Sequence, residues 1–217
     1  MENVSNNEIV FSKHIFYFVK RFFDVIVGIL GIFVLMPLTL IVKIISIING
    51  DHDSIFYSQE RIGKNGKIFK LYKFRSMVPN ADIELKKLLR KKKYREEYKL
   101  NKKIKDDPRI TKVGKFLRKT SLDEVPQFIN ILKGDMAFVG NRPYLPREKE
   151  DMAYSYNDIV ATKPGLTGYW QVNGRSDISF KKRLELEQFY SNNYSLMLDV
   201  KIIFKTIKVV IMRNGAK

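Results

Sequence analysis

The chain has 217 residues and a formal net charge of +17, with 40 Lys and Arg residues against 23 Asp and Glu. This length suits one compact domain, and this charge predicts attraction to polyanions such as nucleic acid, anionic lipid or phosphorylated substrates. The absence of cysteine and the presence of only two histidines exclude disulfides, thiolate metal sites and multi-histidine zinc sites, and leave acid–base chemistry to carboxylates, Lys or Tyr.

The first predicted element is an apolar helix. The run "VIVGILGIFVLMPLTLIV", residues 25–42, carries no charge and approaches the thickness of a bilayer core as a helix. We expect it to be retained, because no A-x-A cleavage site follows it. Pro37 removes a backbone donor and bends a helix, so the run either spans the membrane or dips in and returns to the same face. A buried core helix is a third interpretation.

The next elements are a hairpin and a charged segment. Two β-prone stretches, residues 55–62 and 67–75, flank Asn65-Gly66, a strong signal for a β-hairpin. Residues 82–107 are highly charged and helix-prone, which predicts a solvated helix or a mobile excursion. Nucleic-acid binding is the sharper interpretation of this segment, but no RNP-type aromatics, zinc pattern or helix-turn-helix accompanies it.

An adjacent pair of acids, Asp123 and Glu124, follows a short basic helix predicted over residues 113–119. Pro126 suits a first helical turn, so we expect a second helix to start near Asp123. Ser121-x-x-Glu124 matches a capping box, and capping alone would account for both acids. Two neighbouring carboxylates repel, however, and need compensating positive charge to ionise together. Carboxylates among cations are also what phosphoryl transfer requires.

Two glycine-punctuated segments follow. Residues 140–143, Gly-Asn-Arg-Pro, predict a tight turn that fixes the direction of Arg142, either as a phosphate clamp or as an ordinary loop arginine. The segment "KPGLTGYWQVNGRSDISF" mixes aromatic, amide and guanidinium groups, which suits a nucleotide-sugar and makes Gln171, Asn173 and Arg175 candidate ligands. No Walker A or Rossmann fingerprint is present.

The last predicted element is an amphipathic helix within "SLMLDVKIIFKTIKVVIMRNGAK", residues 195–217. Apolar residues recur there at helical i, i+3 and i+4 spacing, and lysines occupy another face. It is either an ordinary packed surface helix or one that lies in the headgroup interface of a membrane.

Taken in order, these segments resemble one family. An apolar helix with an internal proline, then "YKFRSM", "SLDEVPQFINILKGDMAFVGNRP" and "KPGLTGYWQVNGRS", is similar to the bacterial sugar transferases, the monotopic polyprenyl-phosphate phosphoglycosyl transferases. The resemblance runs from about Val19 to the C-terminus, and is to the short, minimal form of the family.

The resemblance implies an α+β, mainly helical fold. A re-entrant membrane helix, a small β-hairpin and amphipathic interfacial helices would surround a compact cytoplasmic catalytic core. Residues 1–50 would form the N-terminal segment and re-entrant helix, and residues 51–217 the cytoplasmic catalytic domain, which ends in the amphipathic membrane-surface helix.

The implied activity is transfer of a sugar 1-phosphate from a UDP-sugar to undecaprenyl phosphate, with release of UMP, as the first membrane step of surface polysaccharide synthesis. The implied partners are a UDP-sugar, undecaprenyl phosphate and membrane lipids at the cytoplasmic face of the bacterial inner membrane. A homodimer is allowed, and no nucleic acid is expected. The segment "GYWQVNGRSDISF" looks nearer to transferases for a hexose, galactose or glucose, than to those for modified amino sugars.

The resemblance also assigns site residues. Asp123 matches the nucleophile that takes the phosphosugar covalently beside a Mg²⁺ ion, and Glu124 is its partner. Pro37 would break the re-entrant helix. The implied phosphate or nucleotide-sugar contacts are Lys73, Arg75, Arg118, Arg142 and Pro143. The chain has Asn141 and Met36 where family members often have proline and serine, respectively.

Two alternatives remain open from the sequence. A membrane-tethered basic protein that binds nucleic acid or anionic lipid without catalysis would use Asp123 and Glu124 only as helix caps. A membrane-bound phosphodiesterase or phosphatase would use the same two acids and a metal, and would release sugar phosphate into solution.

Overall fold

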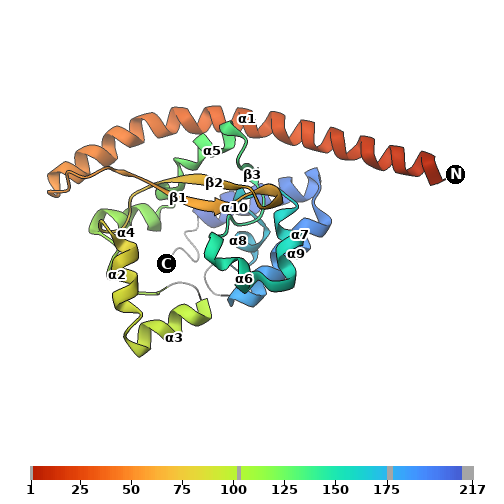
Figure 1. Ribbon diagram of the computed structural model, residues 1–217. Helices are drawn as coiled ribbons and strands as arrows, with labels where there is room; N and C mark the ends of the chain where they lie inside the picture. The colour runs from red at the N-terminus through yellow and green to blue at the C-terminus, as the bar shows by residue number, and fades with distance from the viewer. Residues whose placement is uncertain (1, 102–103, 175–177, 212–217) are drawn as a thin grey trace.

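The computed structural model describes residues 2–101, 104–174 and 178–211. A long helix lies along one side of the molecule, a two-stranded hairpin and short helices lie beneath it, and two charged helices lie on the far side (Figure 1). The helices are α1 (Glu2–Ile48), α2 (Ala81–Leu88), α3 (Lys92–Asn101), α4 (Lys112–Lys119), α5 (Gln127–Lys133), α6 (Lys149–Met152), α7 (Tyr156–Val160), α8 (Tyr169–Asn173), α9 (Phe180–Asn193) and α10 (Leu196–Ile211). The strands are β1 (Phe56–Ile62), β2 (Ile68–Phe74), β3 (Ala137–Val139) and β4 (Gly165–Thr167). The predicted mainly helical fold with a small hairpin is confirmed.

Helix α1 contains one stretch, His14–Ile48, that is long and apolar enough to cross a membrane. The helix continues through Pro37 without interruption. It curves along its length (Figure 1), and the Thr39 hydroxyl donates to the Leu35 carbonyl at 2.7 Å near the proline. Large apolar side chains are exposed on its outer face, among them Phe18, Phe22, Phe33, Met36 and Ile48. The re-entrant path of this helix stays a prediction.

Helix α5 packs closely beneath α1 because two glycines leave room for it. A Cβ atom at Gly28 would lie 2.7 Å from Leu132, and one at Gly31 would lie 2.1 Å from the Phe128 ring. The Arg21 guanidinium of α1 donates to two carbonyls at the end of α5, at 2.6 and 2.7 Å. The two helices are therefore held together both by close packing and by Arg21, which lies at the C-terminus of α5, where the helix dipole favours positive charge.

The predicted hairpin is confirmed with nearly the expected bounds. Strands β1 and β2 pair antiparallel, with Ile62 opposite Ile68 and Phe56 opposite Phe74. Asn65 and Gly66 in the connection have φ values of 56° and 78°, the left-handed region that these two residue types enter most readily.

The free edge of β2 is covered by a side chain from α5. The fully buried Asn130 amide donates to the Lys70 carbonyl at 2.7 Å and accepts the Tyr72 N–H at 3.0 Å. This amide makes the hydrogen bonds that a third strand would otherwise make to β2. It thereby attaches α5 to the edge of the hairpin.

The charged segment forms two short helices, α2 and α3, on the side of the molecule away from α1 (Figure 1). Most of their described Lys and Arg side chains are exposed. This arrangement agrees with the interpretation of the segment as solvated helix.

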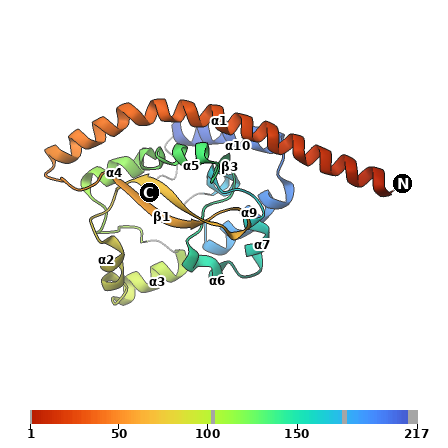
Figure 2. The same ribbon diagram turned by 45° about the horizontal axis from the view of Figure 1, so that its top comes forward.

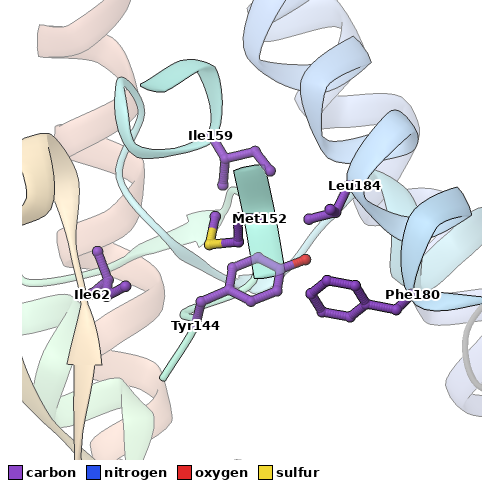
Figure 3. Close-up of a cluster of buried hydrophobic side chains, with 6 residues drawn as sticks. All are labelled: Ile62, Tyr144, Met152, Ile159, Phe180 and Leu184. Carbon is purple, nitrogen blue, oxygen red and sulfur yellow. The ribbon is translucent and has the colours of Figure 1, made fainter. Parts of the chain in front are cut away.

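A buried cluster joins the hairpin end to the second half of the chain (Figure 3). The Tyr144 ring meets Phe180 of α9 edge-on, with centroids 6.0 Å apart. Ile62 of β1, Met152 of α6 and Ile159 of α7 complete the cluster with Leu184. Because Tyr144 directly follows residues 140–143 in the chain, the cluster connects the end of that loop to α9.

Helix α10 has the amphipathic character predicted from the sequence, and residues 212–217 of the predicted segment lie outside the described residues. It lies beside α1 (Figure 2), and the two helices are joined by an ion pair between Lys20 and Asp199. The Tyr190 hydroxyl of α9 donates to the same carboxylate at 2.8 Å, and Lys20 also donates to the Val139 carbonyl at 2.8 Å. One buried polar cluster thus ties α1, α9, α10 and β3 together.

Candidate active site

A hollow of about 330 Å³ opens between the hairpin, the turn after α4, the loop after β3 and the segment from β4 to α8. The short parallel pairing of β3 with β4 brings the last two segments side by side. The hollow is lined by Arg61, Leu71, Lys73, Glu124, Gln127, Arg142, Pro143, Gly165, Leu166 and Gln171. Five residues that the sequence nominated, Lys73, Glu124, Arg142, Pro143 and Gln171, therefore meet at one place.

The two acids sit on a single 3₁₀ turn, Leu122–Glu124, and α5 begins only at Gln127. The helix predicted to start near Asp123 begins there as this 3₁₀ turn, after Ser121 with φ 58°, and its α-helical part starts only at Gln127. The Ser121 side chain makes no capping hydrogen bond, so the capping-box interpretation is wrong. Leu122 and Val125 pack into the cluster that holds Leu35 of α1. The turn is fixed by its apolar neighbours, and capping does not account for its acids.

Glu124 is the member of the pair whose pKa is lowered. Its carboxylate accepts a 2.6 Å hydrogen bond from the Lys73 ammonium of β2. Burial raises the pKa of Glu124, but the charge and hydrogen bond of Lys73, helped by the charges of Arg142 and Arg61, lower it below its ordinary value overall. The compensating cation that the sequence argument required is thus present.

Asp123 differs from its neighbour in its surroundings. Only 8% of the residue is exposed, and burial raises the pKa of its carboxyl to about 6. The negative charge of Glu124 adds to this rise, while Lys73 and Arg118 oppose it. The environment therefore separates the two pKa values, a pattern typical of acids that take different roles in one reaction.

Arg142 is held by its backbone. Its N–H donates to the buried Glu187 carboxylate at 3.1 Å, and the preceding Asn141 amide donates to the Ser191 hydroxyl at 2.6 Å. Glu187 and Ser191 are one turn apart on α9, so they grip the loop together. Burial raises the pKa of Glu187 to about 7. Asn141 thus anchors the turn by hydrogen bonds where a proline would restrict it covalently.

Asp123 itself and three of the nominated binding residues lie outside the lining of the hollow. Arg75 donates to Asp51 at 2.7 Å and to the Ser54 carbonyl at 2.6 Å, so it holds the segment after α1. Asn173 is exposed and accepts from Lys205 of α10 at 3.0 Å. Arg118 donates to the Ser76 hydroxyl at 2.9 Å and acts on Asp123 through its charge.

Arg175, the fourth nominated arginine, lies outside the described residues. Its role, like that of the other nominated ligands, stays a prediction.

Two polar residues of the lining, Arg61 and Gln127, were not predicted from the sequence. Arg61 lies opposite Phe69 in the hairpin register, and Lys73 lies opposite Tyr57. Residues directly opposite share a face, and every second residue returns to it, so this register puts Arg61 on the same face as Lys73. The alternation of the hairpin was therefore a usable signal for Arg61. Gln127 lies about one helical turn after Asp123 and Glu124, at the start of α5.

The donor set fits a magnesium ion that is shared with a substrate. Among the residues that the structure describes, no group of three or more His, Cys, Asp or Glu side chains could hold a metal by itself. Mg²⁺ is commonly bound by one or two carboxylates together with substrate phosphates and water. Asp123 and Glu124, beside a cation-lined hollow, provide such a partial set of ligands.

Comparison with known proteins identifies the family of the chain. Residues 15–213 match the family described as bacterial sugar transferase. The chain is 44% identical over 214 residues to the UDP-galactose-lipid carrier transferase of Erwinia amylovora, covering 98% of this chain and 44% of the relative. It is 43% identical over 200 residues to the undecaprenyl-phosphate galactose phosphotransferase of Salmonella typhimurium, covering 92% of this chain and 42% of the relative.

A third relative has a more similar length. The exopolysaccharide production protein ExoY of Sinorhizobium fredii is 42% identical over 198 residues, which are 91% of this chain and 87% of the relative. The chain spans less than half the length of the first two relatives. With nearly its whole length matched, the chain belongs to the bacterial sugar transferase family.

Proposed function

We propose that this protein transfers a sugar 1-phosphate from a UDP-sugar to undecaprenyl phosphate and releases UMP. The proposal rests on the different environments of the two adjacent acids. Asp123 is buried and has a pKa of about 6, whereas Glu124 is bound to Lys73. Names of two relatives, which refer to a lipid carrier or to undecaprenyl phosphate and to galactose, support the same reaction.

In the first half-reaction, the Asp123 carboxylate attacks the phosphorus that carries the sugar. A bond forms between the carboxylate oxygen and this phosphorus, and the bond from phosphorus to the bridging oxygen breaks. UMP leaves with that oxygen, and the sugar phosphate stays on Asp123 as an acyl phosphate. The cations of the hollow offset the negative charge that would otherwise repel a carboxylate from a diphosphate.

In the second half-reaction, a phosphate oxygen of undecaprenyl phosphate attacks the same phosphorus. The acyl phosphate bond breaks and Asp123 regains its carboxylate, while the lipid gains a diphosphate-linked sugar. Glu124 keeps Lys73 in place during both steps, so that the carboxylate at residue 123 stays close to a positive charge.

Asp123 and Glu124 would hold Mg²⁺ together with the donor phosphates. When bound, the ion supplies neutralisation of phosphoryl charge in the transition state.

Helices α1 and α10 suit a protein that works at a membrane surface. Both expose large apolar side chains, and α10 adds exposed lysines. We place the protein at the cytoplasmic face of the bacterial inner membrane, where a soluble nucleotide-sugar meets a lipid whose phosphate lies at the surface. The re-entrant path through Pro37 and the division into residues 1–50 and 51–217 belong to this proposal.

The first half-reaction should depend on pH through Asp123. Because burial holds the pKa of this carboxyl at about 6, the nucleophilic carboxylate becomes the minor form below that pH. We expect kcat/KM for the donor to fall about tenfold per pH unit below pH 6 and to level off above it. UMP formation without lipid isolates this effect, since the diphosphate of a nucleotide-sugar does not titrate in this range. A flat profile between about pH 5 and pH 7 would contradict the assignment of the nucleophile.

The function is tested by measuring UMP release from a panel of UDP-hexoses and UDP-N-acetylhexosamines. The detergent-purified protein is assayed with Mg²⁺, with and without undecaprenyl phosphate. Multiple turnover with one donor only in the presence of lipid, together with a lipid-linked product, is the expected result, and we expect that donor to be UDP-galactose or UDP-glucose.

The same assay separates the alternatives. Free sugar phosphate without a lipid product would favour a phosphodiesterase. A folded protein that releases no UMP from any donor but binds RNA or anionic vesicles would favour a non-catalytic basic protein.

A further inference from the structure

The hollow of the candidate active site carries a surplus of positive charge. Arg61, Lys73 and Arg142 line it, and Glu124 is the one acid among its lining residues. Lys73 is engaged with Glu124 at 2.6 Å. The two guanidinium groups therefore remain without a neutralising partner in the lining.

The Arg142 guanidinium has no polar partner within the described residues. Its backbone N–H is bound to Glu187, but its side chain makes no hydrogen bond or ion pair in the described part of the chain. Its Nε atom is buried and unpaired. The group stacks over Trp170, with its carbon 5.8 Å from the ring centroid. The Trp170 ring thus orients the Arg142 guanidinium, and the N–H donors of the guanidinium make no hydrogen bond within the described residues.

Arg61 faces Arg142 from the hairpin and bonds only neutral acceptors. It donates to the Pro143 carbonyl at 3.1 Å and to the Gln59 amide oxygen at 2.8 Å, while its Nε atom is buried and unpaired. Burial, and next the charge of Arg142, lower the pKa of Arg61 to about 10. Two partly buried guanidinium groups that line one hollow are stabilised by an anion that bridges them.

A third side chain of the hollow, Gln171, also has a buried polar atom without a partner. The Gln171 amide donates to the Leu166 carbonyl at 3.1 Å, but its Oε1 atom is buried without a partner. This acceptor belongs to the lining that contains both arginines. A ligand that combines anionic phosphates with hydroxyl donors would satisfy all three side chains.

We propose that Arg61 directly binds the diphosphate of the donor, so that Arg61 and Arg142 hold it between two guanidinium groups while Lys73 stays on Glu124. The inference rests on the proposed function and adds to it a binding residue from β1. The planar fork of arginine matches phosphate oxygens in pairs, which lysine cannot reproduce. The bond from Arg61 to Pro143 also connects the hairpin to the loop that carries Arg142.

The test uses the full chain in detergent, without Mg²⁺, and measures binding of inorganic pyrophosphate, UDP and inorganic phosphate by calorimetry. The variants are Arg61→Gln and Arg61→Lys, and Lys70→Gln is the matched control. Lys70 is an exposed cation of the same hairpin that does not line the hollow. Unfolding temperatures of all variants are measured alongside.

We expect Arg61→Gln to weaken pyrophosphate and UDP binding by about tenfold to a hundredfold, as the loss of charge-assisted hydrogen bonds predicts. Arg61→Lys should weaken it by about threefold to tenfold, because charge is kept and the fork is lost. Lys70→Gln should stay within about twofold of the unaltered chain. Phosphate, which stands for the single phosphate of the lipid, should be affected less than pyrophosphate.

A folded Arg61→Gln variant with unchanged pyrophosphate affinity would overturn the inference. If that variant unfolds early, Arg61→Lys decides, and an unchanged affinity there has the same meaning. A larger loss for phosphate than for pyrophosphate would assign the pair to the lipid phosphate and reject the donor diphosphate. If binding depends on Arg61 but no UDP-sugar yields UMP, the anion site stands and the proposed transfer reaction fails.

Discussion

Replacing Asp123 by Asn should reduce donor-dependent UMP release by about a thousandfold or more, which corresponds to ~4 kcal/mol in the activation barrier. An amide cannot form the acyl phosphate with its oxygen at a comparable rate, and no second carboxylate occupies the position, since Glu124 is bound to Lys73. The measurement is a radiolabelled donor assay that follows UMP and protein-bound sugar phosphate in parallel.

The same substitution should stabilise the fold. The folded-state pKa of Asp123, about 6, lies above its ordinary value of 3.8. Stability contributed by the neutral carboxyl is therefore present at low pH and is lost as the pH rises through about 6. An asparagine stays neutral, so at neutral pH it should raise the free energy of unfolding by about 1–3 kcal/mol.

The control for both effects is Asp53→Asn, an exposed aspartate outside the hollow. It should change neither the activity nor the unfolding temperature. An Asp123→Asn protein that forms labelled protein at the normal rate would remove this residue from the covalent step. A loss of activity with a lowered unfolding temperature would instead point to a structural effect.

Replacing Asp199 by Ala should lower the free energy of unfolding by about 3–5 kcal/mol, the largest stability effect that we expect in this chain. The buried carboxylate receives Lys20 of α1 and the Tyr190 hydroxyl of α9. Its removal takes the counter-ion from the Lys20 ammonium and the closer acceptor from the Tyr190 hydroxyl, and leaves both groups with the Val139 carbonyl, at 2.8 and 3.5 Å, where water has little access. The expected result is a lower midpoint of chemical denaturation in detergent, followed by the fluorescence of Trp170.

Two comparisons make this prediction specific. Glu185→Ala removes an exposed carboxylate of α9 that pairs with Lys182, and should change stability by less than about 0.5 kcal/mol. The double variant Lys20→Met, Asp199→Leu should recover part of the loss, because it leaves no buried charge unpaired. Equal effects of Asp199→Ala and Glu185→Ala would contradict a structural role for the buried pair.

The parts of the fold that depend on local sequence could be predicted. Asn65-Gly66 identified the hairpin because few residue types accept positive φ in a short connection. The spacing of apolar residues identified α10, and the segment from Ser121 to Pro126 contained both candidate acids. These signals arise from neighbours in the chain, so a single sequence contains them.

The parts that depend on distant residues could not be predicted. Ser121 fits a capping box by spacing, yet packing of Leu122 and Val125 against Leu35 selects a different backbone. Arg75 was predicted to contact phosphate because it is a cation in the hairpin region, but in the structure it forms an ion pair with Asp51. The hydrogen bond from Asn141 to Ser191 of α9 joins residues 50 positions apart, and no local sequence pattern predicts such a contact.

The close packing of α5 on α1 has a mechanical consequence. Gly28 and Gly31 bring the two helices together, and the turn that carries Asp123 shares a cluster with Leu35 farther along α1. The turn that carries Asp123 and the apolar helix are therefore packed to one another. Under the proposed function, the depth of α1 in the membrane would set the height of the Asp123 carboxylate relative to the lipid phosphates. The helix would then position the carboxylate for the lipid substrate as well as anchor the protein.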